Sequence, residues 1–533
     1  MGANADEHTS DGAVHGRRLA FIFTGLLLAM FVNSLSETIA ATALPTIVGD
    51  LGGVEMMQWI STAYILVSTV VMPVYGKISD LYNRKHVIMV ALALYALGKA
   101  VCGLAVSMEM LICGRCLSGL GGGGLGILAY AIISDVVPPR KLGAYMGIMG
   151  AVFTTSNVLG PVLGGWFVQV PGWRWIFWFT IPLAGLALAA LGAFLPRRTA
   201  QKKRAVIDYA GAALLGLSVT SLVLASAWGG ALYAWDSWEI IGLFALCVAS
   251  AVAFVLVERR ATEPVMPLSL FRNRNFVLCA VTSLIIDVAF MGTVTYLPTY
   301  FQIVDEMSPE LAGLMCVPMS IGIFITSTAS GFIAARTGKY EWMLVASSAI
   351  AAVGFFLMST LQVHEAFWLP LVFLFILGFG IGFGMQILTL VVQNEFPHAM
   401  VGAATAAYNF FSEIGSVLGA SLIGTLFTSR LTAALSATLP ATDNISVAHI
   451  TPALMDKLPA SAQAVIAQGY SDALVPLFLW FVPMVAVTVV MMALVKQHPL
   501  ATTINHGGTK PLRRPSSSRQ DTNRPLPPDS PTR

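Results

Sequence analysis

The chain has 533 residues, of which 56% are hydrophobic and 11% are charged, and its formal net charge is only +3. So few charges cannot cover the water-facing surface of a soluble protein of this length, which excludes a water-soluble fold. The composition indicates a chain that lies largely in lipid.

Fourteen apolar segments follow one another, and each is long enough to cross a hydrocarbon core of about 30 Å as a helix. Because lipid offers no partners to an open backbone, the segments predict an all-α polytopic membrane protein with fourteen transmembrane helices. The expected spans are 19–44, 57–75, 87–106, 110–134, 143–169, 175–195, 209–228, 239–257, 276–301, 311–335, 341–361, 366–391, 401–429 and 473–495.

Basic residues concentrate in alternate loops. With the N-terminus placed inside, 25 of the 30 Lys and Arg residues fall in inner segments, whereas the outer segments hold only Arg174, Arg430 and Lys457. This positive-inside pattern predicts that both termini lie in the cytoplasm. We expect a multi-pass protein of the plasma (cytoplasmic) membrane.

The two halves of the chain share motifs. Leu44-Pro45-Thr46 closes the first span and Leu297-Pro298-Thr299 the ninth, and the loop at Gly76 has a relative at Gly331. Spans 1–6 and 9–14 are therefore expected to form two six-helix bundles with two extra central helices between them, and internal repeats of this kind are common in secondary transporters. The expected division is a cytoplasmic segment 1–17, an N-terminal bundle 18–195, a linker with the two extra helices 196–275, a C-terminal bundle 276–495 with an outer loop 430–472, and a disordered cytoplasmic tail 496–533.

A short charged loop, Gly76-Lys77-Ile78-Ser79-Asp80-Leu81-Tyr82-Asn83-Arg84-Lys85, joins the second and third spans. Gly76 permits a close approach of two helices, and Asp80 can cap the next helix or pair with Arg84. Arg84 and Lys85 hold the loop at the cytoplasmic side. The loop is either a topology signal alone or a conformational latch between the two halves. In the second copy Ala335 takes the acidic position, so we expect a weaker latch there.

Ionisable residues inside the spans are candidates for proton coupling, because a charge is costly in lipid. Glu37 of the first span and Arg115 of the fourth are expected at similar depth, either as a static ion pair or as a carboxylate that alternates between a proton and Arg115. Asp287, near the middle of span 9, is expected to bind a proton or a cation. Glu413 lies in the middle of span 13 and its role stays open, whereas Lys99 is expected to reach the membrane surface.

Span 5 carries Gly160-Pro161-Val162-Leu163-Gly164-Gly165. Small residues four apart let helices pack closely, and Pro161 removes a backbone hydrogen bond and bends the helix. A site for small molecules needs apolar and aromatic walls with a few charges. The aromatic candidates, any of which could instead be a packing residue, are Trp59, Tyr64, Tyr296, Tyr408 and Phe411.

Motifs of several other protein classes do not occur. The sequence contains neither Gly-x-x-x-x-Gly-Lys-Ser/Thr, which binds nucleoside triphosphates, nor His-Glu-x-x-His, which binds zinc. We therefore expect no enzymatic activity, no catalytic residue, no metal and no cofactor. The expected partners are small-molecule substrates, protons and the lipid bilayer, without nucleic acid, and we expect a monomer.

Several of these motifs resemble those of one family. The loop with Gly76, Asp80, Arg84 and Lys85 resembles the signature of the major facilitator superfamily, with Asn83 at a usual glycine position. Glu37 and Arg115 lie in segments similar to motifs of its drug/proton antiporters, which more often have Asp at the Glu37 position. The glycines and proline of span 5 resemble the antiporter signature of the same superfamily.

Over roughly residues 17–495 the chain resembles a fourteen-span drug/proton antiporter of the multidrug efflux type. The resemblance implies proton-driven export of amphipathic, often cationic compounds. Two alternatives stay open. One is export or uptake of a single metabolite, such as a siderophore, amino acid or antibiotic, and the other is a membrane sensor or scaffold that transports nothing.

Overall fold

The computed structural model is almost entirely helical over the residues it describes, which are 16–52, 56–57, 59–196, 208–230, 232–363, 365–438 and 459–500. Fourteen helical segments in these ranges are long and apolar enough to cross a membrane. The prediction of an all-α chain with fourteen spans is thus confirmed. Most of the predicted disordered tail, from residue 501 onward, lies outside the described residues.

The first six spans form one bundle, the N-bundle. Its helices are α1 (Arg17–Leu51), α2 (Trp59–Leu81), α3 (Arg84–Gly103), α4 (Met108–Val136), α5 (Pro139–Gln169), α6 (Trp175–Trp178) and α7 (Thr180–Phe194), the last two sharing one span. The glycines of α4 decide its packing. A Cβ on Gly121 would collide with Tyr95 of α3, and one on Gly123 would collide with Ser68 of α2. Without these side chains α4 packs closely against both neighbours.

The last six spans form the C-bundle. Its helices are α10 (Arg274–Val294), α11 (Leu297–Val304), α12 (Pro309–Met315), α13 (Val317–Thr337), α14 (Glu341–Met358), α15 (Trp368–Glu395), α16 (Val401–Thr438) and α18 (Ala460–Ala493), and short 3-10 turns η2 (Leu268–Arg272) and η3 (His398–Met400) precede α10 and α16. Two spans are broken near their ends. Pro298 and Pro318 lie in the first turns of α11 and α13, where a missing N–H ends the preceding helix at little cost.

Two further helices, α8 (Tyr209–Trp228) and α9 (Trp238–Glu258), connect the bundles. They pack against each other, and α8 also contacts α2 of the N-bundle and α16 of the C-bundle. This pair therefore lies along the seam between the bundles, while α9 has mostly exposed side chains, as expected for a helix that faces lipid.

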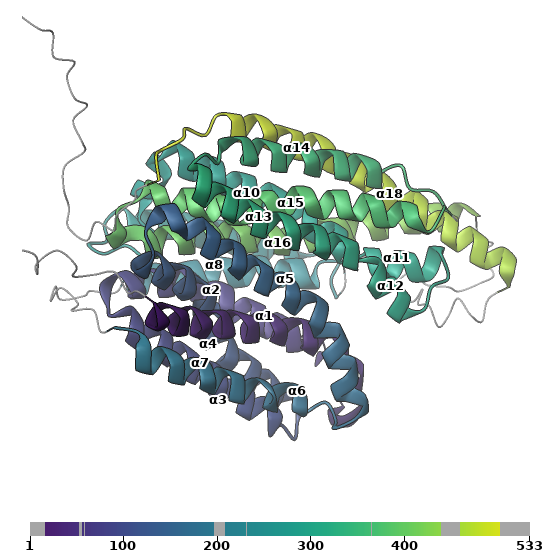
Figure 1. Ribbon diagram of the computed structural model, residues 1–533. Coiled ribbons are helices and arrows are strands. Elements are labelled where there is room, and N and C mark those ends of the chain that lie inside the picture. Colours follow the sequence, from purple (N-terminus) through teal and green to yellow (C-terminus); the bar gives the residue numbers. More distant parts are fainter. Residues whose placement is uncertain are drawn as a thin grey trace, which may run out of the picture.

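The two bundles approach each other at the end where α1 begins and diverge towards the end that carries α6 and α11 (Figure 1). They meet through α5 with α13 and through α2 with α16. A Cβ on Gly331 of α13 would collide with the backbone of Gly143 and Gly147 on α5, so these helices touch almost backbone to backbone. The close end is called the latch end below, because it contains Asp80 and Arg84.

Helices occupy both ends of the outer loop that was expected over 430–472. Helix α16 continues through Thr438 and α18 begins at Ala460, and residues 439–458 lie outside the described part. Leu431 and Leu435 of α16 are buried in the same apolar cluster as Ile466 and Tyr470 of α18. Their spacing of four residues keeps each pair on one helix face, so the two helices stabilise each other beyond the predicted spans.

Candidate functional site

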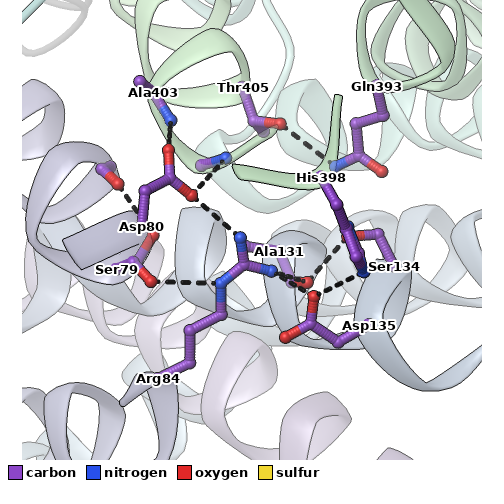
Figure 2. Close-up of polar contacts among 12 residues, drawn as sticks. Ser79, Asp80, Arg84, Ala131, Ser134, Asp135, Gln393, His398, Ala403 and Thr405 are labelled. Carbon is purple, nitrogen blue, oxygen red and sulfur yellow. Dashed lines mark hydrogen bonds and ion pairs between the residues drawn. The ribbon is translucent and has the colours of Figure 1, made fainter. Parts of the chain in front are cut away.

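At the latch end, Arg84 at the start of α3 lies at the centre of a polar network (Figure 2). Its Nη2 is 2.9 Å from Oδ1 of Asp80 on α2, and its Nη1 is 2.6 Å from Oδ1 of Asp135 on α4. The same Nη1 donates to the Ala131 carbonyl at 2.6 Å. Arg84 thereby joins three helices of the N-bundle, and both carboxylates are compensated by its charge.

Asp80 also reaches across to the C-bundle. Its Oδ1 accepts a hydrogen bond from the backbone N–H of Gly402 at 3.0 Å, and its Oδ2 accepts one from Ala403 at 2.8 Å. These N–H groups belong to the first turn of α16, where the helix dipole favours a negative charge. Gly76 makes the approach possible, since a Cβ there would collide with Ala406 and the Gly402 carbonyl.

A second contact crosses the seam beside the first. Nε2 of His398, in the turn before α16, is 3.1 Å from Oδ1 of Asp135 on α4. Neither residue was predicted from the sequence. Asp135 does carry a signal, since it is an acidic residue three turns past the Gly121–Gly124 run of an apolar span, but nothing in the sequence pairs it with Arg84 or His398.

Two details of the loop differ from expectation. Asp80 does not cap the next helix. The side chain of Asn83 caps α3 instead, accepting from the Lys85 N–H at 3.0 Å, while Asp80 caps α16. Lys85 donates to the carbonyls of Gly192 and Leu195 at 2.6 and 2.8 Å, which ties α3 to the end of α7 within one bundle. Lys85 therefore supports the latch end without crossing the seam.

A charged cluster lies deeper in the N-bundle, around Tyr64. Arg115 is 1% exposed, donates to the Ile60 carbonyl at 2.7 Å and places its guanidinium 4.5 Å from the Tyr64 ring centroid. Glu37 is exposed and interacts electrostatically with Arg115 and Lys99. Among the described residues, no ion pair within 4.0 Å joins Glu37 to Arg115, so the structure brings the two together without direct contact.

Lys99 does not reach the membrane surface as expected. Its side chain is fully buried, its Nζ donates to Ser36 Oγ, and it lies 4.9 Å from the Tyr95 ring centroid. The physical reason is helical periodicity, because Lys99 shares the buried stripe of α3 with Tyr95 and Cys102. That spacing was visible in the sequence and could have identified the residue.

A central cavity lies around Asp287, mostly within the C-bundle and bordered by Tyr130 of the N-bundle, and its empty space, including its mouth, is about 610 Å³. Asp287 accepts hydrogen bonds from Ser283 at 3.0 Å and from Ser412 at 2.5 Å. Tyr408 lines the same cavity, and Tyr130 of the N-bundle closes one side by donating to Gln386 at 3.4 Å. The cavity thus combines one carboxylate with amide groups of the C-bundle and with aromatic rings, of which Tyr130 comes from the N-bundle.

Glu413 lies near this cavity and interacts electrostatically with Glu37 and Asp287. Glu413 of α16 thus lies within electrostatic range of one carboxylate on α1 and one on α10, although the three residues are far apart in the chain. The arrangement suits a positively charged ligand or exchangeable protons.

The aromatic candidates occupy different places. Tyr408 lines the cavity and Tyr64 is buried in the charged cluster. Trp59 packs edge-on against Trp228 of α8, Phe411 packs against Phe271 of η2, and Tyr296 donates to the Ala420 carbonyl within the C-bundle. The structure does not bring these last three to the cavity, because each has a packing partner elsewhere.

The glycines of span 5 face α1, the helix that carries Glu37. A Cβ on Gly160 would collide with Thr38, and one on Gly164 would collide with Thr42. Thr38 Oγ1 also donates to the Ser156 carbonyl of α5 at 3.3 Å. A Cβ on Gly165 would meet nothing within 4 Å, so the close contact uses two of the three glycines.

We expect Gly164→Val to leave a folded protein with little activity. The branched side chain would push α5 from α1 beside Glu37, at an overpacking cost of about 1–3 kcal/mol. Gly165→Val is the matched control, because it adds the same group at an open position. Membrane yield and solute flux of both variants measure the effect, and equal flux from the two would contradict the close-packing role.

Known proteins match most of the chain. A model of the Major Facilitator Superfamily matches residues 26–420. An uncharacterized MFS-type transporter of Mycobacterium tuberculosis is 37% identical over 91% of this chain and 70% of its own length. The multidrug transporter protein MdtP of Bacillus subtilis is 35% identical over 84% of this chain and 80% of its own length. The crystal structure of the human organic anion transporter MFSD10 shares the fold, with a TM-score of 0.60 at 15% identity over 90% of this chain and 100% of that one. Matches of this length and identity place the chain in the Major Facilitator Superfamily of membrane transporters.

Proposed function

We propose that this transporter is a proton-coupled antiporter that exports amphipathic, mainly cationic compounds. The observation that carries the proposal is Asp287, a carboxylate in the wall of the cavity, and Glu413 supports it because it interacts electrostatically with both Asp287 and Glu37. Similarity to a multidrug transporter supports the same substrate class. The chain would work as a monomer, since each bundle contributes to the cavity.

A proton and a cationic substrate would compete for the same carboxylates, and this competition would couple their transport. Unpaired negative charges are costly in a poorly hydrated cavity, and either a proton or a cationic substrate removes that cost. Asp287 would bind the substrate cation or a proton, with Ser283 and Ser412 as donors to the charged form. Glu37 would change partners next to Arg115 and Lys99 as the helices move. Glu413 lies between them and would share the proton.

Alternating access would use the latch end. Asp80 and Asp135 contact the C-bundle at that end, and Thr328 donates to the Gly147 carbonyl further along the α5–α13 contact. We place the latch end in the cytoplasm, so that this conformation opens outward and takes up protons. Breaking the contacts of Asp80 with α16 would open the cavity to the cytoplasm, where substrate enters.

The orientation in the plasma membrane has a direct test on the two extra helices. Thr262 follows α9 at the latch end and Asp236 precedes it at the opposite end. Single cysteines at these positions, in a cysteine-free background, should react with an impermeant maleimide from opposite sides. We expect Thr262→Cys to react only after the cytoplasmic face is opened, and Asp236→Cys to react in intact cells. The reverse pattern would overturn the orientation.

The function itself is tested in proteoliposomes with an imposed pH gradient and no nucleotide. We expect the gradient to drive accumulation of several unrelated cationic dyes, and a protonophore to abolish it. Accumulation of one compound alone would favour a dedicated metabolite transporter. Absence of any solute flux or proton movement would favour the sensor or scaffold.

A further inference from the structure

A second hollow lies at the latch end, away from the central cavity. Its walls are the first turn of α5 at Arg140, the turn 337–339 after α13, and the chain segment 497–500 that follows α18. Its empty space, including a wide mouth, is about 850 Å³. The hollow therefore has one wall from the N-bundle and two from the C-bundle, on either side of the α5–α13 contact.

Local hydrogen bonds build the C-bundle walls. Gly338 ends α13 with φ 69°, a conformation that glycine adopts without strain, and turns the chain so that Lys339 lines the hollow. Gln497 donates to the Gly338 carbonyl at 2.8 Å. His498 is held by Glu395, with Nδ1 and Oε1 2.7 Å apart, and by the Tyr340 hydroxyl. These contacts fix the segment 497–500 under the bundle.

The hollow is strongly basic. Arg140 and Lys339 line it, and Lys141, Arg336 and Lys496 are exposed on the three elements around it. Among the described residues, none of these five side chains has an ion pair with an acidic group. The N-terminal end of α5, a helix of 31 residues, adds partial positive charge beside Arg140.

The level of the hollow in the membrane indicates which negatively charged group could pair with its basic residues. Trp342, in the first turn of α14, is 50% exposed, and Phe332 of α13 is 43% exposed, so aromatic rings flank the turn 337–339 on the lipid-facing surface. Tryptophan concentrates at the level of lipid headgroups, and basic pockets between spans at that level suit acidic headgroups.

We propose that this hollow binds the phosphate of an anionic phospholipid headgroup, held by Arg140 from one bundle and Lys339 from the other. A headgroup bound in this way bridges the α5–α13 seam and stabilises the conformation in which the latch end is closed. The headgroup leaves the site when the two bundles move apart. Membranes rich in anionic lipid therefore favour the closed latch end. This bridge rests on the opening of the latch end proposed above, but on no particular substrate and on no proton coupling.

Binding is tested on the purified full chain in detergent by its thermal unfolding midpoint, Tm. We expect short-chain phosphatidylglycerol to raise the Tm of the wild type, and phosphatidylcholine of equal chain length not to do so. R140Q/K339Q should lose the rise. R259Q/R260Q is the matched control, because it removes the same charge from exposed residues at the end of α9, at the same end of the molecule. Its rise should equal that of the wild type.

Three results would overturn the proposal: no rise with phosphatidylglycerol, a rise that R140Q/K339Q keeps, or a full rise with inorganic phosphate alone, which would indicate a site for free anions.

The effect on conformation is measured with Ala334→Cys, at a position that is buried at the α5–α13 contact. In vesicles containing phosphatidylglycerol its maleimide labelling should be slower than in phosphatidylcholine, and R140Q/K339Q should abolish the difference. Equal rates in both membranes would refute the bridge, whether or not the protein proves to be an antiporter.

Discussion

Asp287→Asn is expected to abolish export of cationic compounds while sparing part of the flux of neutral ones. The substitution removes the negative charge of the central cavity but keeps an oxygen that accepts from Ser283 and Ser412. A charge-assisted interaction is worth about 1.5–3 kcal/mol, so the loss should reach roughly tenfold to a hundredfold in cation flux. Flux of a cationic and a neutral dye in the same proteoliposomes measures the difference.

Two further variants separate charge from hydrogen bonding. Ser283→Ala removes one donor to Asp287 and leaves the charge, so we expect a smaller loss that affects both dyes alike. Glu37→Gln should impair both dyes strongly. It removes the carboxylate that acts on both of the buried basic groups, Arg115 and Lys99.

Proton coupling is measured separately, by substrate-induced proton release in detergent with a pH dye. We expect the release to be lost in Asp287→Asn, in Glu37→Gln or in both. Wild-type release from both variants would mean that neither carboxylate couples, and Glu413 would become the next residue to test.

Asp80→Asn should reduce export sharply without preventing membrane insertion. The amide keeps the shape of the side chain but loses the charge that interacts with Arg84 and with two N–H groups of α16. Weakening these contacts by about 1.5–3 kcal/mol would shift the balance between closed and open latch ends by roughly tenfold to a hundredfold. Arg84 keeps Asp135 as a partner, so the N-bundle should still fold.

The matched control is Glu263→Gln, which breaks the 2.6 Å pair with Lys77 in the same loop. Glu263 is 36% exposed, and pairs of this kind contribute about 0–1 kcal/mol, so export should change little. Maleimide labelling of Ala334→Cys should accelerate in the Asp80→Asn background only. Wild-type export and labelling from fully inserted Asp80→Asn would reduce the loop to a topology signal.

The sequence alone determined the fold class, because the solvent imposes it. A span needs about twenty apolar residues whatever its neighbours are, so the fourteen helices can be counted from hydropathy. The loop from Gly76 to Lys85 and its relative at Gly331 are each local patterns, and so is the spacing of Gly160 and Gly164. Their residues lie within two helical turns or one loop, so the sequence predicted which ones act at a helix contact.

Only the tertiary structure decided the partners of these residues. Asp80 meets the first turn of α16 more than 300 residues later in the chain, and Asp135 meets Arg84 and His398 across three elements. Lys99 is buried because its helix face, not its depth, determines its surroundings. Trp59 and Phe411 pack outside the cavity that Tyr408 lines, for the same reason. Hydropathy indicates which segments of the chain lie in lipid, whereas the direction of a side chain depends on how the helices pack.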